Sequence, residues 1–114
     1  MGAMFEHQRK FLRLMTLLLA EAVRLDLPVK FGCFKCNEPG HHARLSLHHD
    51  ALAGDLPMVW PDGRYGTWEE YQPLGNFWKS LDPDCAWGGD FDLNMDGVKK
   101  DDANHFSLRF QGRR

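Results

Sequence analysis

The sequence lacks isoleucine altogether and holds only three cysteines among its 114 residues. Three thiols cannot all pair within one chain, which argues against an extracellular disulfide scaffold and makes a reducing compartment the default expectation. Net charge is also small, at −2, so attachment to nucleic acid or to an anionic membrane by bulk charge is not expected. No apolar run approaches the roughly 20 residues that span a bilayer, so membrane insertion is not expected either.

The chain is long enough for one hydrophobic core, and neither a repeat nor a linker divides it. We therefore predict a single domain over residues 1–114. Six histidines are many for this length, and residues 51–98 carry nine acidic side chains against two basic ones. A solvated acidic surface explains that excess, and so does cation binding. Metal chemistry is therefore the first function to test.

Apolar spacing predicts two helices. Between residues 6 and 26, apolar side chains recur three and four positions apart until a proline ends the pattern. A second helix is predicted over residues 68–81, where Thr67 and Glu70 form a capping-box pair, with Pro73 as an alternative first turn. Alternating patterns predict strands over residues 29–36, 52–60 and 106–110. A helix followed by strands and a further helix gives a small α+β domain.

The N-terminal apolar stretch has a second interpretation. Residues 14–20 follow three basic residues, as in a short secretory signal. The helical apolar spacing continues through the position where such a signal would be cleaved, which favours a folded helix. We therefore expect a chain made in the cytoplasm without a signal peptide.

Two segments resemble cation-binding loops without completing them. Cys33, Cys36 and His41 have the spacing that opens a zinc knuckle, but Ser46 stands where the fourth ligand belongs. A knuckle would make the chain a module that binds single-stranded nucleic acid. The preferred interpretation is that Cys33 and Cys36 are two free cysteines at the end of a strand. The second segment matches the first half of a calcium loop, although Ala103 replaces the bidentate glutamate. Its oxygen ligands would be Asp92, Asn94 and Asp96.

A third set of residues has the composition of a catalytic zinc site. Such a site needs three protein ligands and one open position. His48, Asp55 and His105 are able to supply the three ligands, and Asp102, three residues before His105, is able to act as the base. On spacing alone, hydrogen-bonded surface residues remain the alternative.

The same residues lie within three ordered motifs. The motifs are Ser46-x-His48 continuing to Ala53-x-Asp55-Leu56, then Trp87-Gly88-Gly89, then Asp102-x-x-His105-Phe106. In these motifs the chain resembles the zinc peptidases of peptidoglycan, which comprise D-alanyl-D-alanine carboxypeptidases and dipeptidases and the L-alanyl-D-glutamate endopeptidases of phage lysis. The resemblance covers about residues 29–110.

The resemblance implies a hedgehog/DD-peptidase-like fold with a central antiparallel sheet packed by helices. It implies one zinc ion on His48, Asp55 and His105, with Asp102 as the catalytic acid and base. Three further residues would contact the substrate or the oxyanion: Lys35, Ser46 and Trp87. Lys35 stands where the family has arginine, which removes the two-pronged donor geometry. For Trp87 the alternative is a buried core residue.

The expected reaction is hydrolysis of a peptide bond in the peptidoglycan stem peptide. Residues 71–78 resemble the phage-type members, which favours an L-Ala-D-Glu endopeptidase acting in cell lysis; a D-Ala-D-Ala carboxypeptidase is the alternative. The expected partner is the stem peptide, with no nucleic acid, and the chain is expected to be a monomer that acts on cell-wall peptidoglycan.

Overall fold

Two helices carry most of the regular structure. The computed structural model describes residues 2–34, 50–91 and 102–111. Helix α1 spans Ala3–Arg24 and α2 spans Trp68–Leu81. The prediction of a helix over residues 6–26 is confirmed, with a start three residues earlier. Its buried side chains follow the predicted three-and-four spacing and are Phe11, Leu14, Met15, Leu18 and Ala22.

The capping box fixes the start of α2. The Thr67 hydroxyl accepts a hydrogen bond from the Glu70 backbone N–H at 3.2 Å, and the Glu70 carboxylate accepts one from the Thr67 N–H at 2.9 Å. Pro73 therefore lies inside the helix, and the alternative that it forms the first turn is wrong. The predicted bounds of 68–81 are confirmed.

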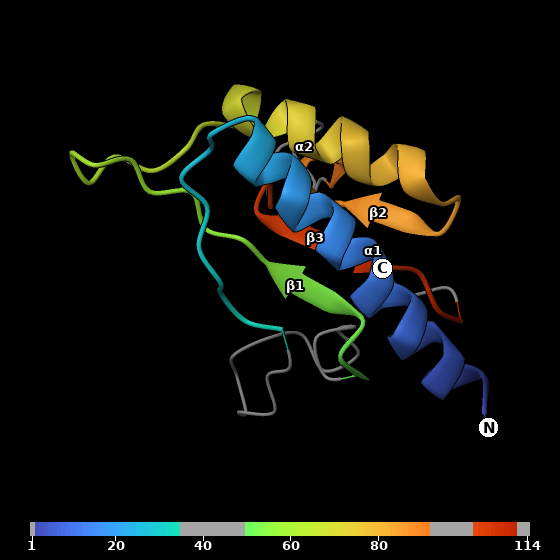
Figure 1. Ribbon diagram of the computed structural model, residues 1–114. Coiled ribbons are helices and arrows are strands. Elements are labelled where there is room, and N and C mark those ends of the chain that lie inside the picture. The colour runs from blue at the N-terminus through green and yellow to red at the C-terminus, as the bar shows by residue number, and fades with distance from the viewer. Residues whose placement is uncertain (1, 35–49, 92–101, 112–114) are drawn as a thin grey trace, which may run out of the picture.

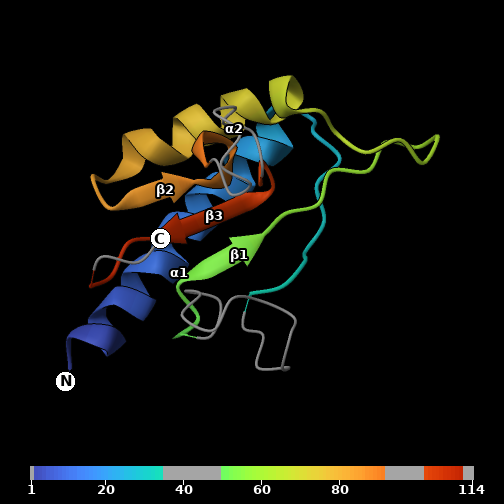
Figure 2. The same ribbon diagram turned by 180° about the vertical axis from the view of Figure 1, so that it is seen from behind.

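Three short antiparallel strands form the sheet. They are β1 (Ala53–Asp55), β2 (Cys85–Trp87) and β3 (His105–Leu108), in the spatial order β1-β3-β2. Figures 1 and 2 show α1 and α2 packed together on one face of this sheet. The molecule is thus a small α+β domain with an antiparallel sheet, as predicted.

The predicted strands are longer than the observed ones. Over the described residues 29–34 and over 52–60, the structure has β1 and isolated bridges, such as the one from Val29 to Met58. The two segments still run side by side, because the Lys30 N–H donates to the Pro57 carbonyl at 2.8 Å. Pro57 has no N–H that could donate a hydrogen bond back to the first segment, and this interrupts the regular pattern of hydrogen bonds between the two segments. The third strand begins one residue before the predicted 106–110 and ends two residues before it does.

A narrow hairpin over residues 58–66 leaves the body of the molecule (Figure 1). Val59 bridges Tyr65, and the Trp60 N–H donates to the Arg64 carbonyl at 2.8 Å. The hairpin leads directly into α2. The position of its base relative to the sheet is therefore set by the start of that helix.

The core lies between the helices and the sheet. Trp78 of α2 is fully buried against Phe106 of β3, with ring centroids 6.2 Å apart. Its indole N–H donates to the carbonyls of Ala86 and Ser107, at 3.1 and 3.0 Å, and so ties α2 to two strands. Among the described residues, no helix combines the length and the apolar character needed to cross a membrane.

Candidate active site at one end of the sheet

The sheet register brings two of the predicted zinc ligands together. Asp55 of β1 is the cross-strand partner of His105 of β3, so both side chains leave the same face of the sheet. Nδ1 of His105 lies 3.7 Å from Oδ1 of Asp55 and 3.7 Å from Oδ2 of Asp102. The histidine side chain is 5% exposed and the two carboxylates are 18% and 34% exposed. The result is a partly buried pair of carboxylates on one imidazole nitrogen.

A short turn places Asp102. The His105 N–H donates to the Asp102 carbonyl at 3.0 Å, which closes the turn, and the Leu56 N–H donates to the Asn104 carbonyl at 2.9 Å, which attaches the turn to the end of β1. The ring of Phe91 lies 5.4 Å from the His105 ring. These contacts hold the imidazole and the Asp102 backbone in a fixed relation.

Trp87 supports this turn from inside the core. Its indole N–H donates to the Ala103 carbonyl at 2.7 Å, one residue after Asp102. The Trp87 side chain is 1% exposed and stacks on Trp68 with a centroid distance of 5.5 Å. The Trp68 indole in turn donates to the Gly89 carbonyl at 2.9 Å. Trp87 therefore reaches the site through the turn, as a buried residue and without an exposed face.

Glycine allows this close packing at two positions. A methyl group at Gly88 would overlap the Asp102 carbonyl oxygen and would lie 2.7 Å from Cβ of His105. A methyl group at Gly75 of α2 would overlap the Trp87 indole. The Trp-Gly-Gly motif and Gly75 thus bring the helix, the strand and the Asp102 turn into direct contact.

Tyr71 is a buried residue of α2 that lies close to this group. Its hydroxyl donates to the Leu56 carbonyl at 2.7 Å, next to Asp55 in the chain. Burial, opposed by a hydrogen bond from the Met58 backbone and reinforced by the negative charges of Asp55 and Asp102, raises the pKa of Tyr71 to about 12. In the sequence, the only sign of this position is a tyrosine on the apolar face of a predicted helix.

A cavity of about 380 Å³ opens beside Asp102. It lies between the hairpin and the Asp102 turn, and its volume is within the range of small-ligand sites. The described residues that line it are Pro57, Met58, Tyr65, Gly66, Tyr71, Asp102, Ala103 and Asn104. The predicted acid/base residue therefore lines a cavity of small-ligand size.

The remaining predicted residues fall outside the described ranges. They are Lys35, Cys36, His41, Ser46 and His48, together with Asp92, Asn94 and Asp96 of the calcium-like loop. In the part of the chain that the structure describes, no three His, Cys, Asp or Glu side chains form a complete metal-binding group. Of the predicted zinc ligands, only Asp55 and His105 lie in the described part of the chain.

The cysteines differ from their prediction. Cys33 is disulfide-bonded, so the interpretation of two free cysteines at the end of a strand is wrong for this residue. Proximity of two sulfur atoms decides whether a disulfide forms, and counting thiols does not reveal it. Cys85 is a free, buried thiol of β2, and burial raises its pKa to about 12.

Zinc fits the described donors. Two ligands held about 2.0–2.1 Å from one tetrahedral zinc ion lie about 3.3 Å apart. The 3.7 Å between Nδ1 of His105 and Oδ1 of Asp55 is near that spacing. An imidazole and a carboxylate are also a donor pair that zinc accepts in catalytic sites.

Comparisons of the chain with protein-family models, with curated proteins and with solved structures found no match.

Proposed function

We propose that the chain is a zinc-dependent peptidase that hydrolyses a peptide bond in the peptidoglycan stem peptide, with the hedgehog/DD-peptidase type of α+β fold. The observation that carries the proposal is the meeting of Asp55, Asp102 and His105 at one imidazole nitrogen, with both distances at 3.7 Å. Asp55 lies 47 positions before Asp102 and 50 positions before His105 in the sequence. Their convergence beside a cavity is what a hydrolytic site requires.

Asp55 and His105 would hold the zinc ion together with His48. When bound, the ion would polarise the substrate carbonyl and lower the pKa of a water molecule. Asp102 would accept the proton of the attacking water at Oδ2 and return it to the amine that leaves. Trp87 would keep the Asp102 turn in place through the Ala103 carbonyl.

Two expected substrate contacts extend this proposal. Lys35 would donate hydrogen bonds to the carbonyl oxygen as negative charge develops there, and Ser46 would orient a ligand or the substrate. Neither residue lies in the described part of the chain, so both roles rest on the motif positions.

An L-Ala-D-Glu endopeptidase is the preferred specificity, because residues 71–78 resemble those of the phage-type members. Mass spectrometry of muropeptides after digestion by zinc-loaded protein tests it. An endopeptidase produces stem fragments that begin with glutamate, whereas a D-Ala-D-Ala carboxypeptidase releases only the terminal alanine. Muropeptides left intact by zinc-loaded protein would overturn the proposed function.

The zinc-knuckle alternative requires Cys33 as a thiolate ligand. The disulfide at Cys33 removes that thiolate. Metal analysis of two variants separates the two proposals: the peptidase site loses zinc in His105→Ala and keeps it in Cys36→Ser, whereas a knuckle shows the reverse.

A further inference from the structure

We propose that Phe91 is a positioning residue of the candidate site, whose ring packs against the His105 imidazole and keeps Nδ1 directed toward Asp55 and Asp102. The proposal deepens the zinc peptidase function and rests on it. The centroids of the two rings lie 5.4 Å apart, and the ring planes are inclined by 52°. Phe91 would therefore influence the affinity and the geometry of the metal without being one of its ligands.

The side-chain torsion of His105 leaves the imidazole a choice of orientation. The pairing of β1 with β3 fixes the His105 backbone, but the preference of an imidazole for rotation about its last side-chain bond is broad and roughly two-fold. A half-turn would put a ring carbon where Nδ1 now faces the carboxylates. The distances of 3.7 Å from Nδ1 to Asp55 and to Asp102 exceed the usual length of a hydrogen bond. Packing against the ring therefore contributes to the choice between the two orientations.

Burial makes the contact between the two rings effective. Phe91 is 4% exposed and the His105 side chain is 5% exposed. A protein interior is packed so densely that a planar ring has little room to turn. Aromatic pairs at this spacing also contribute more than the area that they bury. Removal of the Phe91 ring would open space beside the imidazole, which would then occupy more than one orientation.

The Trp-Gly-Gly segment brings Phe91 against His105. The Phe91 N–H donates to the Gly88 carbonyl at 3.0 Å and closes the short helical turn η2 (Gly88–Asp90). Because Gly88 has no side chain, this turn passes close to the histidine, and a methyl group there would lie 2.7 Å from Cβ of His105. The path of the turn thus places the next residue, Phe91, beside the imidazole.

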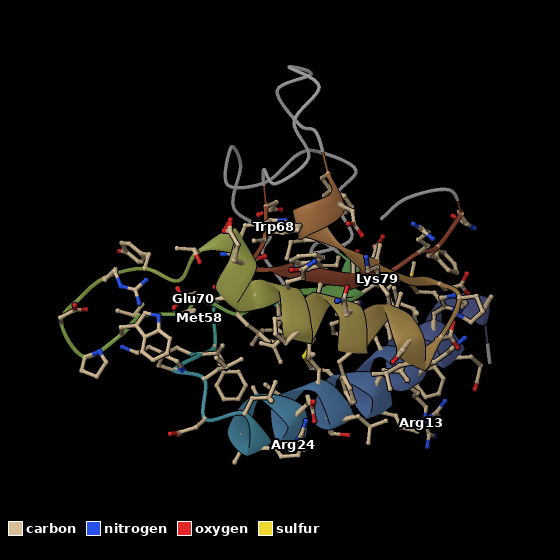
Figure 3. The ribbon with its side chains drawn as sticks, turned by 90° about the horizontal axis from the view of Figure 1, so that it is seen from above. Arg13, Arg24, Met58, Trp68, Glu70 and Lys79 are labelled. Atoms are coloured by element: carbon tan, nitrogen blue, oxygen red, sulfur yellow. The ribbon has the colours of Figure 1, made fainter. Side chains whose placement is uncertain are left out.

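Helix α2 anchors the same turn. The Trp68 indole N–H donates to the Gly89 carbonyl at 2.9 Å, and the Lys79 ammonium lies 2.8 Å from Oδ2 of Asp90. Figure 3 shows Trp68 and Lys79 on the side of α2 that lies away from α1. Contacts with the helix, which do not involve a metal, therefore fix the two residues that precede Phe91. The support for the imidazole is thus preorganised.

Zinc affinity and a cobalt spectrum test the proposal in the full-length protein. Competition with a chromogenic chelator gives the zinc affinity, and Co²⁺ in place of zinc reports the coordination geometry through its visible absorption. Phe91→Leu keeps an apolar side chain and removes the ring, so we expect about 10-fold weaker zinc binding and an altered cobalt spectrum. Phe91→Tyr keeps the ring, so its zinc affinity should stay within about twofold of the wild type, with an unchanged cobalt spectrum.

Phe11→Leu is the matched control. Phe11 is 5% exposed on α1, and its ring packs on Trp78 with a centroid distance of 5.9 Å. The same substitution there should lower the melting temperature and leave the zinc affinity and the cobalt spectrum unchanged. Equal losses of zinc affinity in Phe91→Leu and Phe11→Leu would overturn the positioning role. A loss in Phe91→Tyr as large as that in Phe91→Leu would overturn it as well.

The outcomes also separate the positioning role from the peptidase. Weaker zinc binding in Phe91→Leu, with a zinc-loaded wild type that leaves peptidoglycan intact, would support the positioning role and reject the peptidase. Peptidoglycan hydrolysis by the wild type, with wild-type zinc binding in Phe91→Leu, would support the peptidase and reject the positioning role. A wild type that binds neither zinc nor cobalt would overturn both.

Discussion

At the scale of single residues, the Trp87 indole N–H connects the core to the proposed acid/base residue. Trp87→Phe keeps an aromatic ring but removes the donor to the Ala103 carbonyl. Leaving a buried carbonyl without its donor costs about 1–3 kcal/mol of unfolding free energy. We expect that loss in urea unfolding, together with a lower kcat and a nearly unchanged KM.

Trp78→Phe is the matched control for that prediction. Trp78 is also buried, and its indole donates to Ala86 and Ser107 and not to the Asp102 turn. It should destabilise the protein by a comparable amount while its kcat falls less. Equal kcat values in the two variants would show that Trp87 acts only through stability.

Gly88 is a second residue whose role is local. Gly88→Ala places a methyl group against the Asp102 carbonyl and Cβ of His105. Because the obstacle is backbone, the turn must shift, and overpacking of this kind costs about 1–3 kcal/mol. We expect lower zinc occupancy and a lower melting temperature. Gly2→Ala, where no atom lies within 4 Å of the added methyl group, should leave zinc occupancy unchanged.

Tyr71 predicts a response to alkaline pH. Burial, the largest cause, raises the pKa of Tyr71 from its ordinary 10.0 to about 12. Folding therefore favours the neutral phenol. Its contribution to the free energy of unfolding is complete below pH 10 and is lost as the pH rises through 12. The size is on the order of 2 kcal/mol. Urea unfolding between pH 9 and pH 12 should show a steeper decline for the wild type than for Tyr71→Phe; parallel declines would contradict this assignment.

At the scale of elements, the Glu70 carboxylate accepts hydrogen bonds from the start of α2 and from Arg64 of the hairpin. The hydrogen bonds from Arg64, the largest cause, and from the Thr67 backbone lower the pKa of Glu70 to about 2 from 4.5. Folding favours the ionised carboxylate. Its contribution to the free energy of unfolding is therefore present above pH 4.5 and is lost as the pH falls through 2. Glu70→Gln keeps a side chain suited to the capping box and removes the charge.

Unfolding experiments at pH 6 and pH 3 test that shared role. The wild type should exceed Glu70→Gln in stability at pH 6, and the difference should shrink at pH 3. Because the pair is exposed, high salt should reduce the difference as well. A difference that does not depend on pH would assign the effect to packing instead.

At the scale of the whole molecule, local patterns were predicted better than contacts between distant segments. The α2 bounds followed from a capping box and an apolar face, both of which are encoded within 15 residues. The strands were overestimated because Pro57 interrupts pairing with residues 28–33, an effect that depends on the partner segment.

The candidate site shows the same difference between local sequence patterns and contacts between distant segments. The motifs name Asp55, Asp102 and His105 as candidates, and the β1–β3 register pairs Asp55 with His105. The support from Trp87 to Ala103 spans 16 positions, and the cavity joins the hairpin to a turn about 40 residues later, so neither has a local signature. Tyr65 and Tyr71 are placed beside Asp102 only by the folded structure, in which both line the same cavity.

The central claim is that this site hydrolyses peptidoglycan with Asp102 as acid and base. The most direct measurement is the release of new amino groups from purified peptidoglycan by zinc-loaded wild type and by Asp102→Asn, with zinc content measured in both. We expect release by the wild type and a decrease of about 10²–10⁴-fold in the variant, which keeps its zinc. No release by zinc-loaded wild type, or full activity in Asp102→Asn, would contradict the claim.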